Sequence, residues 1–161
     1  MQMLIDNEFV YDEMVIKNGY VMAFDFGEKR IGVAGGASAL GLAMPLALIE
    51  DDANNLRFQQ IATLIAEWQP KLLVVGLPMS MQGEAHKLTH LCKKFARRLN
   101  GRFNLPVMLV DERLSSIEAS QFLSENGIRG RKQKPLLDQV AAQIILQSYF
   151  DYFTAKLHEA T

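Results

Sequence analysis

The sequence predicts an α/β fold in which a three-stranded antiparallel meander is followed by alternating helices and strands. Short glycine-containing connections separate the first three strand candidates, which indicates antiparallel neighbours. An all-apolar run at 72–76 is typical of a strand covered on both faces, and apolar residues recur at helical spacing before and after it. The predicted order is β-β-β-α-β-α-β-α-α, without an internal repeat or a dividing linker.

The first half of the chain contains most of the predicted sheet. The first three strands are predicted over residues 20–24, 30–35 and 42–49. A helix follows, which either Asn54 or Asn55 can cap and which Pro70 ends. The next strand is the apolar run at 72–76.

The second half is predicted to contain three helices and one strand. A helix over 83–100 leads into a buried strand over 106–110 that ends at Asp111 and Glu112. A helix over 115–126 is closed by Gly127, and a basic loop follows. The last helix begins near Pro135, a favoured residue in a first helical turn, and continues to about Phe153.

Length and composition are those of one soluble globular domain: the chain has 161 residues, of which 49% are hydrophobic and 22% charged. Residues 1–18 contain four acidic residues and Lys17 alone as a cation, the opposite of a signal-peptide start. We therefore expect an acidic N-terminal extension over 1–18 and one domain over 19–161.

The protein is expected to be cytoplasmic. The single cysteine, Cys92, fits a reducing compartment and lies in an apolar stripe at helical spacing, which predicts a buried side chain and not a nucleophile. Residues 31–49 have no charged side chain, but their four glycines and Pro45 indicate a turn between strands and not a membrane span. No membrane association is expected.

A basic segment lies within this nearly neutral chain, whose formal net charge is -1. Residues 87–134 contain eleven basic side chains against four acidic ones. Such a segment is a candidate for contacts with nucleic-acid phosphates, although basic faces are often merely solvated.

Carboxylates stand at the ends of predicted elements. Asp25 closes the first strand, Asp111 and Glu112 close the last, and Asp138 lies in the first turn of the final helix on a face with small residues. If the two strands lie close in the sheet, these acids converge where ligands of such sheets collect.

Acids that converge in this way repel one another unless a cation neutralises them. Oxygen ligands favour Mg²⁺ or Mn²⁺, and two such ions roughly 4 Å apart assist phosphodiester cleavage. Taken singly, each acid has another explanation: Asp25 as a turn former, Asp111 as the ion-pair partner of Arg113, and Asp138 as a charge near a helix start.

Four segments together resemble the YqgF-type family of Holliday-junction resolvases and pre-16S rRNA nucleases. They are FDFGEKRIGVA, VVGLPMSMQGE, DERLSSIEA and LLDQVAAQIIL, in this order, and the resemblance runs from about Gly19 to Phe153. It implies a ribonuclease H-like fold with a mixed five-stranded sheet flanked by helices. It also implies metal-dependent cleavage of nucleic acid, usually in maturation of the 5′ end of the 16S rRNA precursor in the bacterial cytoplasm.

Carried over by position, the resemblance implies that Asp25, Glu112 and Asp138 are the catalytic and metal-binding acids. Asp111 is a further metal candidate, but neighbours in an extended segment point to opposite faces, and we favour Glu112. The implied cofactor is Mg²⁺ or Mn²⁺, and the implied partner is structured RNA, with branched DNA less favoured. The candidate phosphate contacts are Lys29, Arg30, Lys87, Lys94, Arg97, Arg98, Arg113, Arg129, Arg131, Lys132 and Lys134.

The chain departs from the family pattern before the last aspartate, where a Lys-Gly pair is usual. Here the sequence is KQKPLLD, and Pro135 restrains a backbone that glycine would leave loose. In addition, no acid follows VAGG in the second strand.

Two other classes of function compete with a nuclease. A ribosome-assembly or transcription factor could use the same scaffold for binding without turnover, and would then not depend on Asp138. A sugar-kinase or actin-like ATPase has a similar DFG-hairpin, but it needs two such lobes, and this length supplies one. The glycines after Asp25 do not form GxGxxG and no Walker-type lysine loop is present, so no nucleotide cofactor is expected.

Overall fold

A computed structural model describes residues 3–4, 18–51, 53–77, 83–111, 125, 127 and 140–152; of 3–4, 83–86 and 111 it describes the backbone only. The predicted helix over 115–126 therefore lies almost entirely outside the described residues. Gly127, which was expected to close it, has a φ of 82°, in the left-handed region that glycine favours.

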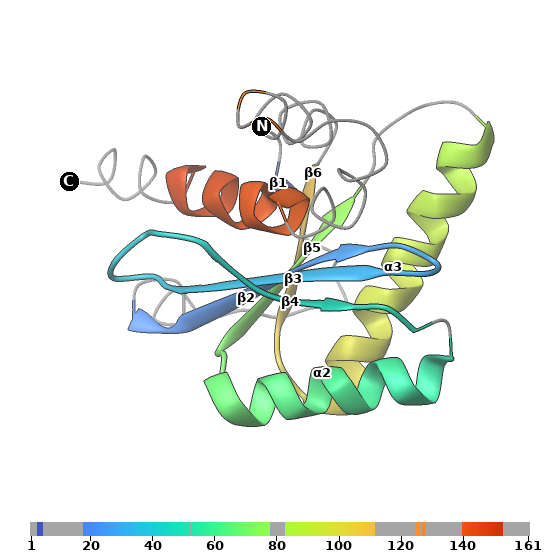
Figure 1. Ribbon diagram of the computed structural model, residues 1–161, viewed down its shortest axis with the longest axis horizontal. Coiled ribbons are helices and arrows are strands. Elements are labelled where there is room, and N and C mark those ends of the chain that lie inside the picture. Colours follow the sequence, from blue (N-terminus) through green and yellow to red (C-terminus); the bar gives the residue numbers. More distant parts are fainter. Residues whose placement is uncertain are drawn as a thin grey trace.

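One mixed sheet forms the centre of the molecule, with strand order β1-β6-β5-β2-β3-β4 (Figure 1). β2 pairs antiparallel with β3, β3 pairs antiparallel with β4, and β5 runs parallel to both β2 and β6. The bounds are β2 (Tyr20–Phe26), β3 (Ile31–Ala37), β4 (Met44–Ile49), β5 (Leu72–Leu77) and β6 (Val107–Asp111). The predicted meander and the two parallel strands are confirmed.

A sixth strand joins the five that were expected. β1 (Met3–Leu4) pairs antiparallel with β6, with Met3 opposite Val110 and Leu4 opposite Leu109. Two residues of the acidic extension thus form the edge of the sheet next to β6. An isolated pair of this kind has no periodicity, so the sequence gives no signal for it.

The other edge strand is β4, which in the described part of the chain pairs with β3 alone. The register between them shifts at Val33/Ala34, and Pro45 lies opposite Ala34. Proline is tolerated in sheets at edges and bulges because it has no N–H to donate.

Helices cover both faces of the sheet, which explains why all six residues of β5 are buried. α2 (Asn54–Trp68) and α3 (Gly83–Phe103) pack with the face that carries Phe24 and Val75. A C-terminal helix, described over 140–152, packs with the face that carries Val21 and Ala23 (Figure 1, red). The sheet therefore separates two apolar cores.

Two details of the helices differ from the predictions. Neither Asn54 nor Asn55 caps α2: the cap residue is Ala53, which makes no side-chain cap hydrogen bond and whose N–H donates to Asp51 Oδ1 at 2.9 Å. The acidic side chain before the helix thus orders the turn that leads into it. α3 continues past residue 100 to Phe103.

Cys92 is fully buried in the core between α3 and the sheet, as predicted. No helix of the described residues is long and apolar enough to cross a bilayer.

Candidate active site at the carboxyl end of the sheet

Asp25 is the sixth of the seven residues of β2 and lies opposite Gly32 of β3. Side chains alternate along a strand, so Asp25 shares a face with Val21 and Ala23, which pack with the C-terminal helix. Those two residues are fully buried, whereas Asp25 is half-buried. β2 thus carries the Asp25 carboxylate out of the core at the carboxyl end of the strand, as predicted.

A glycine lies beside Asp25 on the neighbouring strand. Phe24 pairs with Val75, so the next residues in register are Asp25 and Gly76, and Gly76 in turn pairs with Val110 of β6. Because Leu72 and Val74 face the C-terminal helix, position 76 faces the same way. β5 therefore places no side chain between Asp25 and the end of β6 on this face.

The first described turn of the C-terminal helix approaches the same face with small side chains. Ala141 and Ala142 are buried, as is Ile145, and the latter two belong to the core cluster with Val21 and Ala23. These are the small residues that were expected on the face of Asp138, and they lie against the sheet. Small residues let the backbone of the helix come near the sheet at its N-terminal end.

Two of the three favoured acids lie outside the described residues. These are Glu112 and Asp138, so their predicted convergence with Asp25 stays a prediction. The backbone of Asp111 ends β6, where it pairs with Leu77. Across the parts of the chain that are described, no group of three or more His, Cys, Asp or Glu side chains gathers in a metal-binding arrangement.

The turn that follows Asp25 is fixed by α2. Arg57, only 4% exposed, donates a hydrogen bond from its guanidinium to the carbonyl oxygen of Gly27, and its Cζ atom lies 5.2 Å from the centre of the Phe26 ring. At Gly27 a Cβ would lie 2.6 Å from the carbonyl oxygen of Arg30, so the turn requires glycine. The Nε atom of Arg30 lies 3.6 Å from Glu50 Oε1.

Sequence reasoning did not single out Arg57. The available signal was its position, because Arg57 stands four residues before Ile61 and beside Phe58 on the side of α2 that faces the sheet. A cation in such a stripe needs an acceptor, which the turn after β2 provides.

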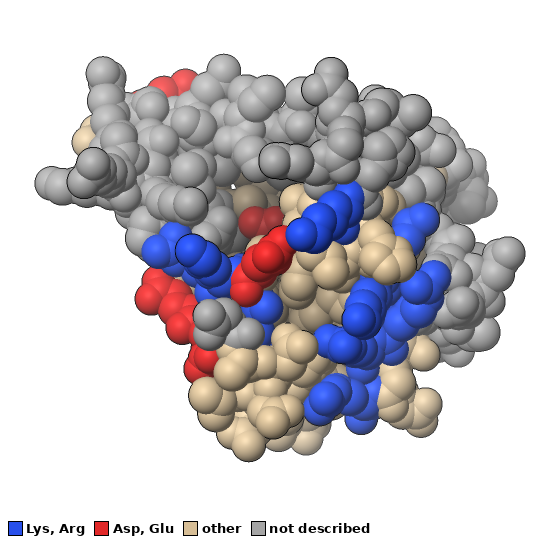
Figure 2. All heavy atoms as spheres, turned by 90° about the vertical axis from the view of Figure 1, so that its right-hand side faces the viewer, with Lys and Arg blue, Asp and Glu red and all other residues tan. Residues whose placement is uncertain are grey.

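Cationic side chains gather on the side of the molecule that carries α3 (Figure 2). Lys87, Lys94, Arg97 and Arg98 are exposed there, and Lys29 is exposed at the tip of the β2–β3 turn. Arg30 is half-buried in its pair with Glu50. The other predicted phosphate contacts lie outside the described residues: Arg113, Arg129, Arg131, Lys132 and Lys134.

The family model for RuvX, described as Holliday junction resolvase, matches residues 19–152. The chain belongs to the RuvX family. Its resolvases are nucleases, a class of hydrolase, so the resemblance seen in the motifs and the enzyme class are confirmed for the family. The match begins at Gly19, where the acidic extension was expected to end.

Relatives within the family carry a different description. A protein of Methylobacillus flagellatus named "Putative pre-16S rRNA nuclease" is 68% identical over 133 residues, which cover 83% of this chain and 91% of that protein. A protein of the same name from Chromobacterium violaceum is 60% identical over 131 residues, covering 81% and 96% of the two chains.

The fold of this RuvX-family chain is shared with a solved resolvase. T. thermophilus RuvC, determined in complex with a Holliday junction substrate, superposes with a TM-score of 0.53 at 13% identity, over 85% of this chain and 96% of that one. The predicted ribonuclease H-like fold is thereby confirmed.

Proposed function

We propose that the protein is a divalent-metal-dependent nuclease that cleaves the 5′ leader of precursor 16S rRNA in the bacterial cytoplasm. One observation supports this above all: Asp25 leaves the core at the carboxyl end of β2 on the face of the C-terminal helix, with Gly76 beside it. The names of the relatives that are 68% and 60% identical favour ribosomal RNA as the substrate.

The described part of the site fits a hard cation. Carboxylate oxygens are preferred ligands of Mg²⁺ and Mn²⁺, and Gly76 lies beside Asp25 in the sheet without a side chain that would compete for the carboxylate. We propose that Asp25, Glu112 and Asp138 hold the metal, with Asp111 as a further candidate. Bound there, it would supply activation of water and charge stabilisation in phosphodiester hydrolysis.

The choice of Glu112 over Asp111 has support in β6. Met108 and Val110 belong to the core cluster on the C-terminal-helix side, the side of Asp25. Continued alternation favours position 112 over position 111 as the acid that joins Asp25.

The exposed cations of α3 and of the β2–β3 turn are proposed to bind substrate phosphates. Contacts of this kind position nucleic acid without reading its bases, so they suit either RNA or DNA. Branched DNA is therefore the second candidate substrate, and the description of the family model as Holliday junction resolvase favours testing it.

The decisive experiment compares the protein with its Asp25→Asn and Glu67→Gln variants. Each is incubated with a precursor 16S rRNA fragment and with a four-way DNA junction, in Mg²⁺, Mn²⁺ or chelator. Glu67 is an exposed acid on α2 and controls for a simple loss of negative charge. We expect cleavage of the rRNA that requires metal, survives in Glu67→Gln and falls at least about a hundredfold in Asp25→Asn.

The other outcomes separate the competing functions. Cleavage of the junction alone would identify a resolvase. Binding without cleavage, equal in all three proteins and independent of metal, would identify a non-catalytic assembly factor and leave Asp25 with a structural role.

A further inference from the structure

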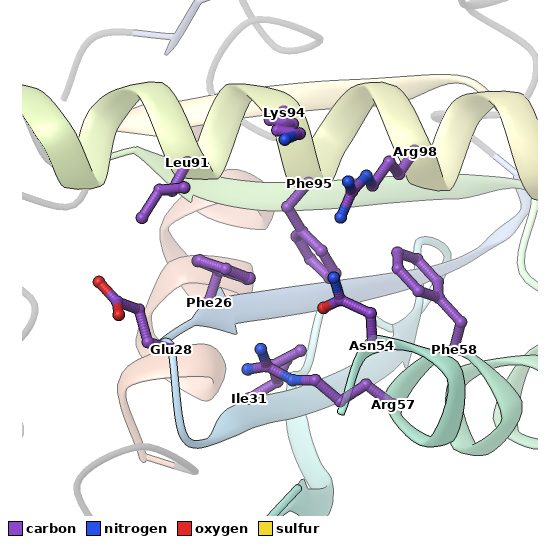
Figure 3. A pocket seen from close by; sticks show the side chains of 10 residues that line it. All are labelled: Phe26, Glu28, Ile31, Asn54, Arg57, Phe58, Leu91, Lys94, Phe95 and Arg98. Carbon is purple, nitrogen blue, oxygen red and sulfur yellow. The ribbon is translucent and has the colours of Figure 1, made fainter. Parts of the chain in front are cut away.

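A pocket of about 270 Å³ opens between the β2–β3 turn, the start of α2 and the middle of α3 (Figure 3). Its walls come from three separate segments of the chain, around Phe26, Asn54 and Phe95. The volume lies just below the usual range for small-molecule sites, roughly 300–1,000 Å³, and suits one small unit of a larger ligand.

One side of the pocket is aromatic. The Phe26 and Phe95 rings have centroids 4.8 Å apart at an angle of 33°, and Phe95 also contacts Phe58 at 5.9 Å. Phe95 and Phe58 are buried, whereas Phe26 is half-buried at the pocket. Phe26 therefore presents part of its ring to the pocket, and Phe95 and the Arg57 guanidinium hold that ring in place.

The pocket is also cationic. Arg57, Lys94 and Arg98 line it against one acid among the lining residues, Glu28. Within the described residues, neither Lys94 nor Arg98 forms an ion pair. In Figure 3 the Arg98 guanidinium and the Asn54 amide point into the space beside the aromatic rings.

The pocket lies on the opposite side of β2 from the proposed metal site. Asp25 and Phe26 are consecutive strand residues, so their side chains point to opposite faces at the same end of the sheet. Within the described residues, the β2–β3 turn, with the exposed Lys29, lies between the two sites at this end of the sheet. A single strand of nucleic acid that crosses this turn would contact both the pocket and the proposed metal site.

We propose that this pocket binds one unstacked nucleotide of the substrate strand, next to the nucleotides that reach Asp25. The phosphate contacts Lys94 and Arg98, and the base lies against Phe26 with its edge at the Asn54 amide. An aromatic ring and a cation in one pocket are the usual means of holding a base and its phosphate without sequence preference. This assignment rests on the proposed action on nucleic acid.

Binding of AMP and of inorganic phosphate, measured by calorimetry in chelator, tests the pocket without any cleavage. We expect one AMP per chain, bound more tightly than phosphate. Phe26→Leu and Asn54→Ala are expected to lower AMP affinity about fivefold while phosphate binding is kept, because they remove contacts to the base. Arg98→Gln should lower both affinities about tenfold.

Lys93→Gln is the matched control, since it removes one charge from the same helix at a residue that does not line the pocket, and AMP affinity should stay within twofold. Asn54→Ala leaves the cap of α2 intact, because that cap is Ala53. If the Phe26→Leu variant does not fold, Asn54→Ala therefore still tests the proposal.

A short single-stranded RNA distinguishes a nucleotide of the substrate from a free mononucleotide. We expect the RNA to displace AMP and to bind several-fold less tightly to Asn54→Ala. AMP that binds no better than phosphate, or AMP that the RNA does not displace, would overturn the proposal. If the protein binds AMP as expected but cleaves neither substrate, the proposed nuclease activity is refuted and the proposed nucleotide binding in the pocket is kept.

Discussion

The guanidinium of Arg57 donates a hydrogen bond to the carbonyl oxygen of Gly27, two residues after Asp25. Through this contact α2 sets the position of the turn on which the first carboxylate of the site depends. The buried cation also lies over the Phe26 ring, so one side chain orders the pocket wall and the end of β2 together.

Arg57→Met should lower the free energy of unfolding by about 1.5–3 kcal/mol, because the carbonyl of Gly27 loses a charged donor in a partly buried site. Urea denaturation measures this change. Lys71→Met, which removes an exposed cation immediately before β5, is the control and should shift the midpoint little. An unchanged midpoint in Arg57→Met would show that the contact contributes nothing net.

Gly36→Ala and Gly101→Ala should change stability in opposite directions. A Cβ at Gly36 would lie 2.2 Å from the backbone carbonyl oxygen of Leu42, which cannot move away as a flexible side chain can, so we expect a loss of about 1–3 kcal/mol. At Gly101, within α3, a Cβ meets nothing within 4 Å, and alanine should stabilise the helix by about 0.5–1 kcal/mol. Thermal unfolding of both variants measures the difference, and equal shifts would contradict it.

Gln147 should hold the β3–β4 connection against the C-terminal helix. Its Oε1 accepts from the N–H of Ala43 at 3.0 Å, and its Nε2 donates to the carbonyl oxygen of Gly41 at 2.9 Å. Gln147→Leu removes both bonds and should cost about 1–3 kcal/mol. Hydrogen exchange of the Ala43 amide should accelerate, whereas Gln59→Leu on the exposed side of α2 should leave it unchanged.

The exposed cations of α3 should make RNA binding dependent on salt. Each phosphate contact adds roughly 0.7–0.9 to the slope of log affinity against log salt concentration. Replacing Lys87, Lys94 and Arg97 together by glutamine should lower that slope by roughly two, with binding measured in chelator. Lys71→Gln should keep the slope, and an unchanged slope in the triple variant would place the phosphate contacts elsewhere.

The strands could be predicted from the sequence because burial on one or both faces leaves a local pattern, as in the all-apolar β5. The place of Asp25 near the end of β2 could also be predicted, and its role in a site stays a prediction that rests on the need of such a carboxylate for a partner. The position of Gly76 beside Asp25 could not be predicted, since it depends on the register between β2, β5 and β6.

Other features depend on contacts between residues far apart in the chain. β1 forms because Met3 and Leu4 pair with β6, and a strand of two residues has no periodic pattern from which it could be predicted. Arg57 and Asn54 line a pocket only because α2 begins beside the β2–β3 turn. The cap of α2 was predicted wrongly because the helix already begins at Asn54, so that Ala53 is the cap and both asparagines lie in the first turn.

The edge strand β4 also bears on how copies of this protein behave at high concentration. An open strand edge is a template for pairing with another chain, and Leu42 and Met44 expose apolar side chains at the start of this one. Pro45 and the irregular pairing opposite it at Val33/Ala34 break the regular row of donors and acceptors along β4. Pro45, an exposed residue outside the site and both core clusters, thus protects the folded protein against aggregation through this edge.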